Sequence, residues 1–257
     1  MKKFIMVMLF IQSYINLYSQ DSANNSRHYF GFSIGNIQTK DENLIPKVHS
    51  GLINMISYRY ERISSSYNLF DFNLGYGLLK TKIEKEAVSF NCQLALSYCY
   101  NLSLIRNDFI NYYLGPKISF TSSLAEYGVF DEAHAYWGNF LSLCLSNVSF
   151  ISIDPEKDLV FNLDISIIGL YTRPEYNRLY SNEYWTFSNI IDIMNSNYKF
   201  GFLNNAFQFK ASAEYRTQIW NSNDLSLALS VYYSRIKDEA GKPLTELIPK
   251  ISLGIWL

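Results

Sequence analysis

The sequence predicts an all-β chain that folds as a transmembrane antiparallel β-barrel of ten strands, with eight or twelve as the alternative strand counts. Three observations predict this class. Apolar and polar residues alternate along most of the chain, and the connections between the alternating segments are short and long in turn. The amino-terminal residues have the layout of an export signal. Alternating segments of about ten residues separated by turns are typical of transmembrane barrels.

The composition of the 257 residues fits a strand-rich protein that contacts both lipid and water. Aromatic residues make up 17% of the chain, charged residues make up 18%, and the mean hydropathy is −0.06. Soluble domains usually carry about 25% charged residues. The aromatic content excludes an intrinsically disordered chain. A net charge of −1 with interspersed signs lacks the basic footprint of a nucleic-acid-binding protein, so we expect no nucleic-acid partner.

Residues 1–20 predict a cleaved secretory signal peptide. Lys2 and Lys3 precede an uncharged apolar run over residues 4–11, and a polar stretch follows up to position 20. This is the three-part layout of an export signal. The alternative is a membrane anchor, but a spanning helix needs roughly 20 apolar residues. Cleavage after position 19 or 20 leaves residues 21–257 as a single barrel domain, and we expect it to be monomeric.

Ten segments are predicted as strands from their two-residue period. In residues 206–219, Phe207, Phe209 and Ala211 lie on one face, and Gln208, Lys210 and Ser212 lie on the other. Strict alternation of this kind favours a strand with one apolar face over a helix. Most segments reach the roughly 9–11 residues with which a tilted strand crosses a bilayer. The expected strands are 28–38, 51–64, 67–80, 87–104, 109–122, 139–153, 159–172, 206–220, 225–238 and 250–257.

The connections predict which ends of the strands lie together. Short turns follow the second, fourth, sixth and eighth strands, whereas the connections after the other strands, including residues 38–50, are mostly longer. Short periplasmic turns and longer external loops are typical of transmembrane barrels. An even strand count places both chain ends on the periplasmic side. The alternative is a secreted soluble barrel or sandwich that binds a hydrophobic ligand, whose apolar residues would point inward.

Two further motifs resemble a known class of proteins. The stretch YYLGPKISF at residues 112–120 is similar to strands common in small outer-membrane β-barrel proteins of Gram-negative bacteria. The last strand ends in Ile255-Trp256-Leu257, whereas the class usually ends in an aromatic residue, so the match departs at the final position. The resemblance covers residues 21–257. It implies a location in the cell outer membrane, contact with its lipid, and recognition of the last strand by the barrel-assembly machinery.

If the apolar positions face lipid, a balanced set of charged residues faces the lumen. A balanced set predicts ion pairs that fill a narrow interior, because buried charges need partners. An open ion pore would carry a biased ring of charge instead. We therefore expect a non-enzymatic structural or binding role, or a narrow solute passage. The expected lumen network consists of Arg59, Glu61, Asp71, Lys117, Asp164, Lys210, Glu214 and Arg216.

An enzymatic alternative rests on one external loop. Some barrels of this architecture hydrolyse lipid or peptide, and such chemistry needs a positioned base beside a nucleophile or water. In the segment FDEAHAYWGN, Asp131 or Glu132 can orient His134. No serine stands at diagnostic spacing from His134, so a solvated histidine is the favoured interpretation. The sequence predicts neither a metal site nor a cofactor, because no second ligand cluster accompanies these residues.

The long connection over residues 173–205 is rich in aromatic residues. One interpretation is that residues 198–202 prolong the following strand and that a short helix covers the barrel mouth. The other is a binding surface for a hydrophobic or glycan ligand, since aromatic rings offer stacking and apolar contact. The residues that would form this surface are Tyr180, Tyr184, Trp185 and Phe187.

Overall fold

The computed structural model describes residues 26–42, 45–80, 86–102, 110–127, 134–173, 198–220, 223–237 and 241–257. The proposed signal peptide, residues 1–20, lies outside this part of the chain. Within the described residues there is no helix long and apolar enough to cross a membrane.

The described residues form eleven strands. These are β1 (Ser26–Asp41), β2 (Ile45–Ile63), β3 (Ser66–Lys80), β4 (Glu86–Asn101), β5 (Ile110–Tyr127), β6 (His134–Asp154), β7 (Lys157–Thr172), β8 (Lys199–Phe202), β9 (Ala206–Trp220), β10 (Asn223–Lys237) and β11 (Pro243–Trp256).

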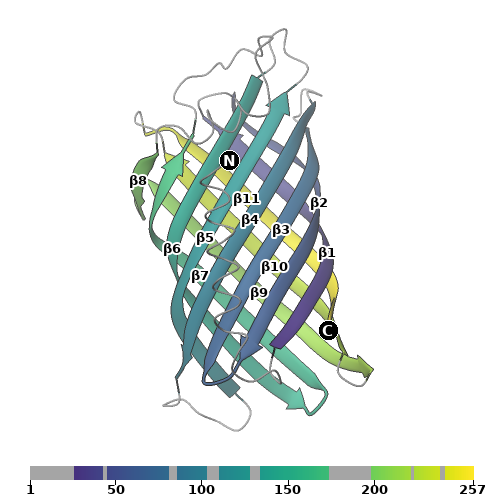
Figure 1. Cartoon of the computed structure of the whole chain (residues 1–257). Helices are drawn as coiled ribbons and strands as arrows, with labels where there is room; N and C mark the ends of the chain where they lie inside the picture. Colours follow the sequence, from purple (N-terminus) through teal and green to yellow (C-terminus); the bar gives the residue numbers. More distant parts are fainter. Residues whose placement is uncertain are drawn as a thin grey trace, which may run out of the picture.

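Ten of these strands, all except β8, close into one antiparallel barrel. Each strand pairs with its neighbours in the sequence, and β1 pairs with β11 along most of its length, from Tyr29–Trp256 to Asp41–Leu244. Figure 1 shows the strands inclined to the barrel axis, so that the strands of the near wall cross those of the far wall. The predicted fold class and the count of ten barrel strands are confirmed. Closure removes the unpaired edges that an open sheet would expose.

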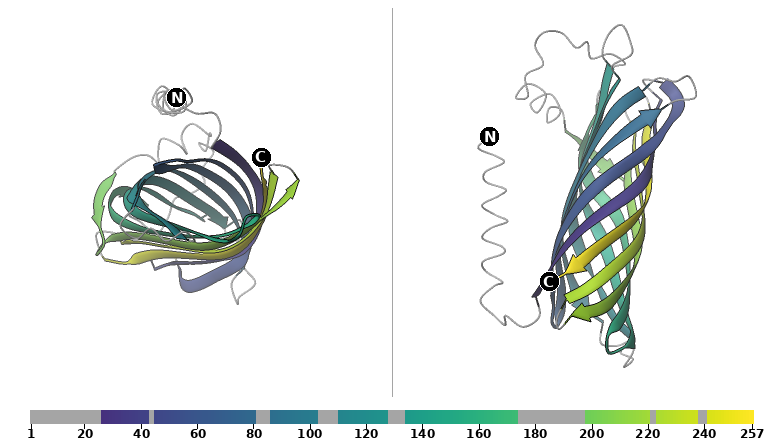
Figure 2. Two further views of the ribbon diagram at one scale, coloured as in Figure 1. Left: turned by 90° about the horizontal axis from the view of Figure 1, so that it is seen from below. Right: turned by 90° about the vertical axis from the view of Figure 1, so that its right-hand side faces the viewer.

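One end of the barrel carries the tight turns, and we call it the turn end; the opposite end is the loop end. The carboxyl terminus lies at the turn end (Figure 2), where the backbone amide of His28 donates to the carbonyl of Leu257. In the turn between β6 and β7, the Lys157 ammonium group donates to the Asp154 carboxylate at 2.7 Å, and the backbone amide of Glu156 donates to the same group. These hydrogen bonds lower the pKa of Asp154.

Five strands extend at least three residues beyond their predicted bounds, namely β1, β2, β5, β6 and β11. The connection expected over residues 38–50 is short, because β1 runs to Asp41 and β2 begins at Ile45. Polar residues such as Gln38 and Lys40 had indicated a loop, yet Thr39 and Asp41 alternate with them and are buried inside the barrel. The last strand begins at Pro243 instead of residue 250, since the barrel tolerates Pro249 within β11.

Short β8 continues the wall beyond β9. β9 pairs with β7 up to Ile165–Phe209, and β8 takes over the same edge from Ile168–Phe202 to Tyr171–Lys199. This arrangement agrees with the interpretation that residues 198–202 prolong the strand.

A bulge in β7 reverses the faces of its last residues. Leu143 pairs with Ile168, but the next residue, Cys144, pairs with Ser166, so Ile167 is an extra residue in β7. A bulge of one residue shifts the two-residue alternation by one position. As a result Tyr171 is buried in the interior, whereas an uninterrupted alternation along β7 would place it on the outer face.

Candidate functional site

The charged residues predicted for the lumen come from five strands and face the interior. Arg59 and Glu61 lie on β2, Asp71 on β3, Lys117 on β5, Asp164 on β7, and Lys210, Glu214 and Arg216 on β9. Six of the eight are buried, and Arg59 and Lys210 are partly buried. Strands β2 and β9 are separated in the barrel by β1, β11 and β10, so contacts between them cross the lumen.

Two arginines bind two glutamates across the lumen toward the turn end. The Arg216 guanidinium group donates to both carboxylate oxygens of Glu61, at 2.8 and 2.9 Å. The Arg59 guanidinium group donates to both oxygens of Glu214, at 2.8 and 3.3 Å, and Arg216 also contacts Glu214 at 3.3 Å. Two-point contacts of this kind add geometric specificity as well as energy. The four residues therefore tie β2 to β9 across the interior.

Aromatic side chains complete this arginine–glutamate cluster. The Arg59 guanidinium carbon lies 3.7 Å from the centre of the Tyr29 ring, and that of Arg216 lies 4.2 Å from the Trp256 ring. The Trp256 indole N–H donates to Glu214 at 2.9 Å. Trp256 is fully buried in the lumen, while Ile255 and Leu257 are exposed on the outside. The aromatic residue of the carboxyl-terminal motif therefore faces the interior.

The lysines pair with aspartates nearer the middle of the barrel. Lys117 Nζ lies 2.7 Å from Asp164 Oδ2, and Ser146 Oγ donates to the other oxygen of Asp164 at 2.6 Å. Lys210 Nζ lies 2.7 Å from Asp71 Oδ2. All eight charged residues thus take part in ion pairs.

Four further charged residues lie in the described interior, outside the set of eight predicted for the lumen. Glu246 on β11 is buried and accepts hydrogen bonds from Ser123 Oγ at 2.9 and 3.1 Å. The Lys250 ammonium nitrogen Nζ lies 3.4 Å from the amide oxygen Oδ1 of Asn73. Glu246 was missed because the predicted last strand began only at residue 250, whereas β11 begins at Pro243. Lys250 is the first residue of that predicted strand and lies opposite Ile251 on the inner face, but it was not included in the expected lumen network.

The other two residues close the loop end. The Arg173 guanidinium group donates to Asp41 Oδ1 and to the backbone carbonyls of Ile236 and Lys242, each at 2.8 Å. Asp41 had been assigned to a connection, and Arg173 to the start of the long loop. Their contact joins the loop ends of β1, β7 and β10.

Apolar clusters flank the ion pairs along the barrel axis. At the turn end, Tyr67, Leu69, Tyr113 and Phe150 belong to one buried cluster. Toward the loop end, a second cluster includes Ile37, Ile53, Leu79, Leu244 and Ile248, and a third is formed by Phe140, Tyr171, Ala206 and Ile236. Three cavities lined by lumen residues have volumes of about 10, 30 and 50 Å³. Such cavities hold single waters or small water clusters, so side chains fill most of the described interior.

The residues proposed for catalysis and loop binding lie mostly beyond the described part of the chain. Asp131, Glu132, Tyr180, Tyr184, Trp185 and Phe187 are outside it. His134 is the first residue of β6 and its backbone pairs with Tyr127 at the loop end.

His28 Nδ1 lies 3.0 Å from the Tyr58 hydroxyl at the turn end. Among the described residues, no three His, Cys, Asp or Glu side chains gather as metal ligands, and Cys92, Cys99 and Cys144 are free thiols.

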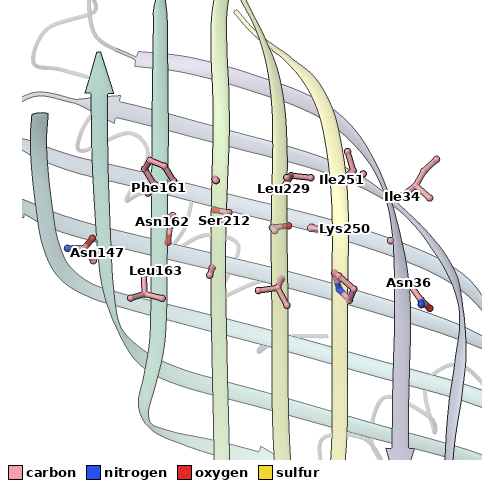
Figure 3. Close-up of a pocket in the computed structure, with 16 residues that line it drawn as sticks. Ile34, Asn36, Asn147, Phe161, Asn162, Leu163, Ser212, Leu229, Lys250 and Ile251 are labelled. Carbon is pink, nitrogen blue, oxygen red and sulfur yellow. The ribbon is translucent and has the colours of Figure 1, made fainter. Parts of the chain in front are cut away.

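The outer surface is apolar, in contrast to the ion-paired interior. Large apolar side chains are exposed on it, including Leu52 at 66% and Ile251 at 57%. The outer wall over β7, β9, β10, β11 and β1 contains a depression of about 780 Å³ (Figure 3). Apolar side chains such as Phe161, Leu163 and Ile34 border this depression.

Comparisons with known proteins support the class of fold. No protein-family model matches the chain, and no curated protein sequence matches it. Among solved structures, the outer membrane protease OmpT from Escherichia coli superposes with a TM-score of 0.55 and 7% identity, covering 91% of this chain and 97% of OmpT. The translocator domain of the autotransporter NalP from Neisseria meningitidis has a TM-score of 0.44 and 8% identity, covering 98% and 97%. The β-domain of the Bordetella autotransporter BrkA has a TM-score of 0.43 and 7% identity, covering 91% and 99%.

The closed antiparallel barrel and its likeness to OmpT define the class. By its fold, this chain is an outer-membrane-type β-barrel.

Proposed function

We propose that this protein is a sealed β-barrel of the cell outer membrane with a structural and binding role that is not enzymatic. The observation that carries the proposal is the filled interior. Ion pairs cross the lumen from β2 to β9, and buried apolar clusters lie on either side of them along the axis. A water-filled pore would leave these inward side chains accessible to solvent, yet most of them are buried.

The distribution of apolar residues supports a membrane location. Exposed aliphatic and aromatic side chains alternate with buried polar ones along the barrel strands. A barrel in lipid needs apolar residues on its outer face, whereas the soluble alternative needs them on the inner face alone. Cleavage of the proposed signal peptide would deliver the mature chain to the envelope, where lipid and the barrel-assembly machinery are its expected partners.

The filled interior favours a sealed barrel over a narrow solute passage. Opening a path between Arg216 and Glu61 would separate two charges held at 2.8 and 2.9 Å in a buried environment. Breaking a buried pair by removing one partner typically costs about 3–5 kcal/mol. The cluster at Tyr67 and Phe150 would still close the turn end.

Single-channel recording in planar lipid bilayers tests this proposal. We expect no stepwise conductance when the refolded full-length barrel is incorporated, because the lumen offers no continuous aqueous path. Folding of the same preparation is checked on SDS gels, where the unboiled barrel should migrate differently from the boiled protein. Regular conductance steps from incorporated barrel would overturn the sealed interior in favour of a solute passage.

The hydrolase alternative needs a separate assay. His134 begins β6 at the loop end, where substrate from outside the cell would arrive. We expect the purified barrel to hydrolyse neither peptide nor lipid. Hydrolysis that disappears in His134→Ala would replace the non-enzymatic role with an enzymatic one.

A further inference from the structure

One lysine in the lumen lacks the carboxylate partner that the other described lumen cations have. Lys250 lies on the inner face of β11, and it forms no ion pair with any residue that the structure describes. Its ammonium nitrogen Nζ lies 3.4 Å from Asn73 Oδ1 and 3.8 Å from Met55 Sδ. A lysine ammonium group has three N–H donors, and Asn73 Oδ1 already accepts a hydrogen bond from Ser57 Oγ at 2.6 Å. These contacts therefore leave the charge of Lys250 largely uncompensated.

Two carboxylates line the same lumen cavity as Lys250, and both are occupied by other groups. Asp71 Oδ2 accepts a hydrogen bond from Lys210 Nζ at 2.7 Å, and Asp71 Oδ1 accepts one from a side-chain amide at 2.8 Å. Both oxygens of Glu214 belong to the arginine–glutamate cluster. Neither carboxylate can neutralise Lys250 without leaving another cation unpaired.

A row of polar side chains crosses the inner wall at the level of Lys250. Ser230 on β10 pairs with Lys250 and, on its other side, with Ser212 on β9. Asn162 on β7 pairs with Ser212, and Figure 3 shows Asn162, Ser212 and Lys250 at one level of the wall. The Ser230 hydroxyl oxygen is buried and has no hydrogen-bond partner among the described residues. The row thus places hydroxyl and amide groups beside an ammonium group, and it contains no carboxylate.

The four residues of this row all line the lumen cavity of about 50 Å³. A single water needs roughly 10–15 Å³ of such space, so the cavity has room for a chloride-sized ion and accompanying water. The other cations that line it, Arg59, Lys210 and Arg216, are ion-paired, so Lys250 leaves one positive charge in excess.

We propose that this cavity binds a small monovalent anion of the size of chloride, held by the Lys250 ammonium group and the Ser230 hydroxyl. A buried charge is unfavourable unless a partner of opposite charge replaces the water it has lost. The anion supplies to Lys250 what carboxylates supply to the other described lumen cations. One excess positive charge favours a monovalent ion over sulfate or another dianion. The ion is enclosed as the barrel folds, so the site is compatible with a sealed lumen.

Urea titrations of the full-length barrel in lipid vesicles test the site. The chloride concentration is raised tenfold while gluconate, which is too large for the cavity, keeps the ionic strength constant. A ligand that binds only the folded state raises the folding equilibrium constant in proportion to its concentration once it exceeds its Kd, so we expect a rise of up to about tenfold. A folding equilibrium that does not respond to chloride would overturn the proposal.

Lys250→Met supplies the matched variant, because it removes the excess charge and keeps an unbranched side chain. We expect its folding equilibrium to be independent of chloride. The control combines Lys117→Met with Asp164→Asn, which makes the same lysine substitution in an ion pair outside this cavity. The control should keep the chloride dependence of the unaltered barrel. If Lys250→Met kept it as well, the effect would be a general one of the salt and the site would be excluded.

Bromide can locate the anion directly. Crystals of the barrel grown in bromide should show a peak of anomalous scattering in the cavity beside Lys250 Nζ. A cavity without such a peak would overturn the site. The outcomes also separate the two proposals: a barrel that stays silent in bilayers and does not respond to chloride keeps the proposed function and loses the anion site.

Discussion

At the scale of single residues, Lys117 and Asp164 show why charges inside the barrel are paired. Their side chains are only 3% and 6% exposed, so neither charge is solvated by bulk water. Transfer of a charge from water to such an interior is costly unless a partner of opposite charge and further hydrogen bonds replace the water. Here Lys117 and Ser146 both donate to Asp164.

Separating this pair should destabilise the barrel, and removing both charges should restore most of the stability. We expect Asp164→Asn to lower the free energy of unfolding by about 3–5 kcal/mol, because it leaves the Lys117 ammonium group buried without its carboxylate. Adding Lys117→Met removes the stranded charge, while the amide oxygen introduced at position 164 can still accept the Ser146 hydrogen bond. Denaturant titrations in lipid vesicles, read from the gel mobility of the folded form, measure both variants.

The turn between β6 and β7 provides the control for that experiment. Asp154 and Lys157 also form an ion pair at 2.7 Å, but their side chains are 38% and 42% exposed. Exposed pairs contribute little to stability, so Asp154→Asn should leave the titration nearly unchanged. A double Lys117/Asp164 variant that is no more stable than Asp164→Asn alone would contradict the account of a stranded charge.

Alternation predicted the face of each lumen residue but not its partner. Along β2, the two-residue alternation puts Arg59 and Glu61 on the inner face and their neighbours Tyr58 and Tyr60 on the outer face. Pairing of Arg59 with Glu214, 155 positions away, depends on which strands meet across the lumen. Glu246 and Lys250 share the same two-residue period; Glu246 was missed because the predicted last strand began only at residue 250.

At the scale of elements, Pro116 and Pro249 lie in the middle of strands, and each interrupts one ladder. Opposite Pro116, the pairing of β4 with β5 skips from Ser97–Lys117 to Tyr100–Leu114. Opposite Pro249, the pairing of β1 with β11 skips from Gly35–Lys250 to Gln38–Leu247. At the second site, a Cβ atom on Gly35 would lie 2.7 Å from the Pro249 carbonyl oxygen, so glycine permits this close approach. Neither interruption shifts the register, so the strands continue past both prolines.

Restoring the missing N–H should close the β1–β11 ladder. We expect Pro249→Ala to slow amide hydrogen exchange in residues 34–38, because alanine can donate to β1 where proline cannot. Pro116→Ala is the matched control and should slow exchange around residues 97–100 instead. Exchange in 34–38 that is unchanged by Pro249→Ala would show that something other than the missing donor keeps this ladder open.

At the scale of the whole molecule, closure determines the stability of the barrel. Every strand of the barrel, including the first and the last, has a partner on both sides. In lipid, each unpaired backbone group costs several kcal/mol, so a closed barrel cannot open one strand at a time without a large penalty. The cross-lumen pairs and apolar clusters add contacts between opposite walls.

A barrel held in this way should resist detergent until it is heated. We expect the full-length protein to fractionate with outer membranes and to migrate differently on SDS gels before and after boiling. An aliquot unfolded in urea before loading serves as the reference for the heated form. A soluble protein whose mobility does not depend on heating would contradict the membrane location.

The sequence alone was sufficient for the class of fold, the ten barrel strands and the inward set of eight charges. A two-residue period is a local property, because successive side chains in a strand point to opposite faces whatever lies beyond. Three features required the tertiary structure: the partners across the lumen, the bulge that turns Tyr171 inward, and the depression over Ala211 and Pro249. Each of them depends on residues that are distant in sequence and become neighbours only when ten strands close in one register.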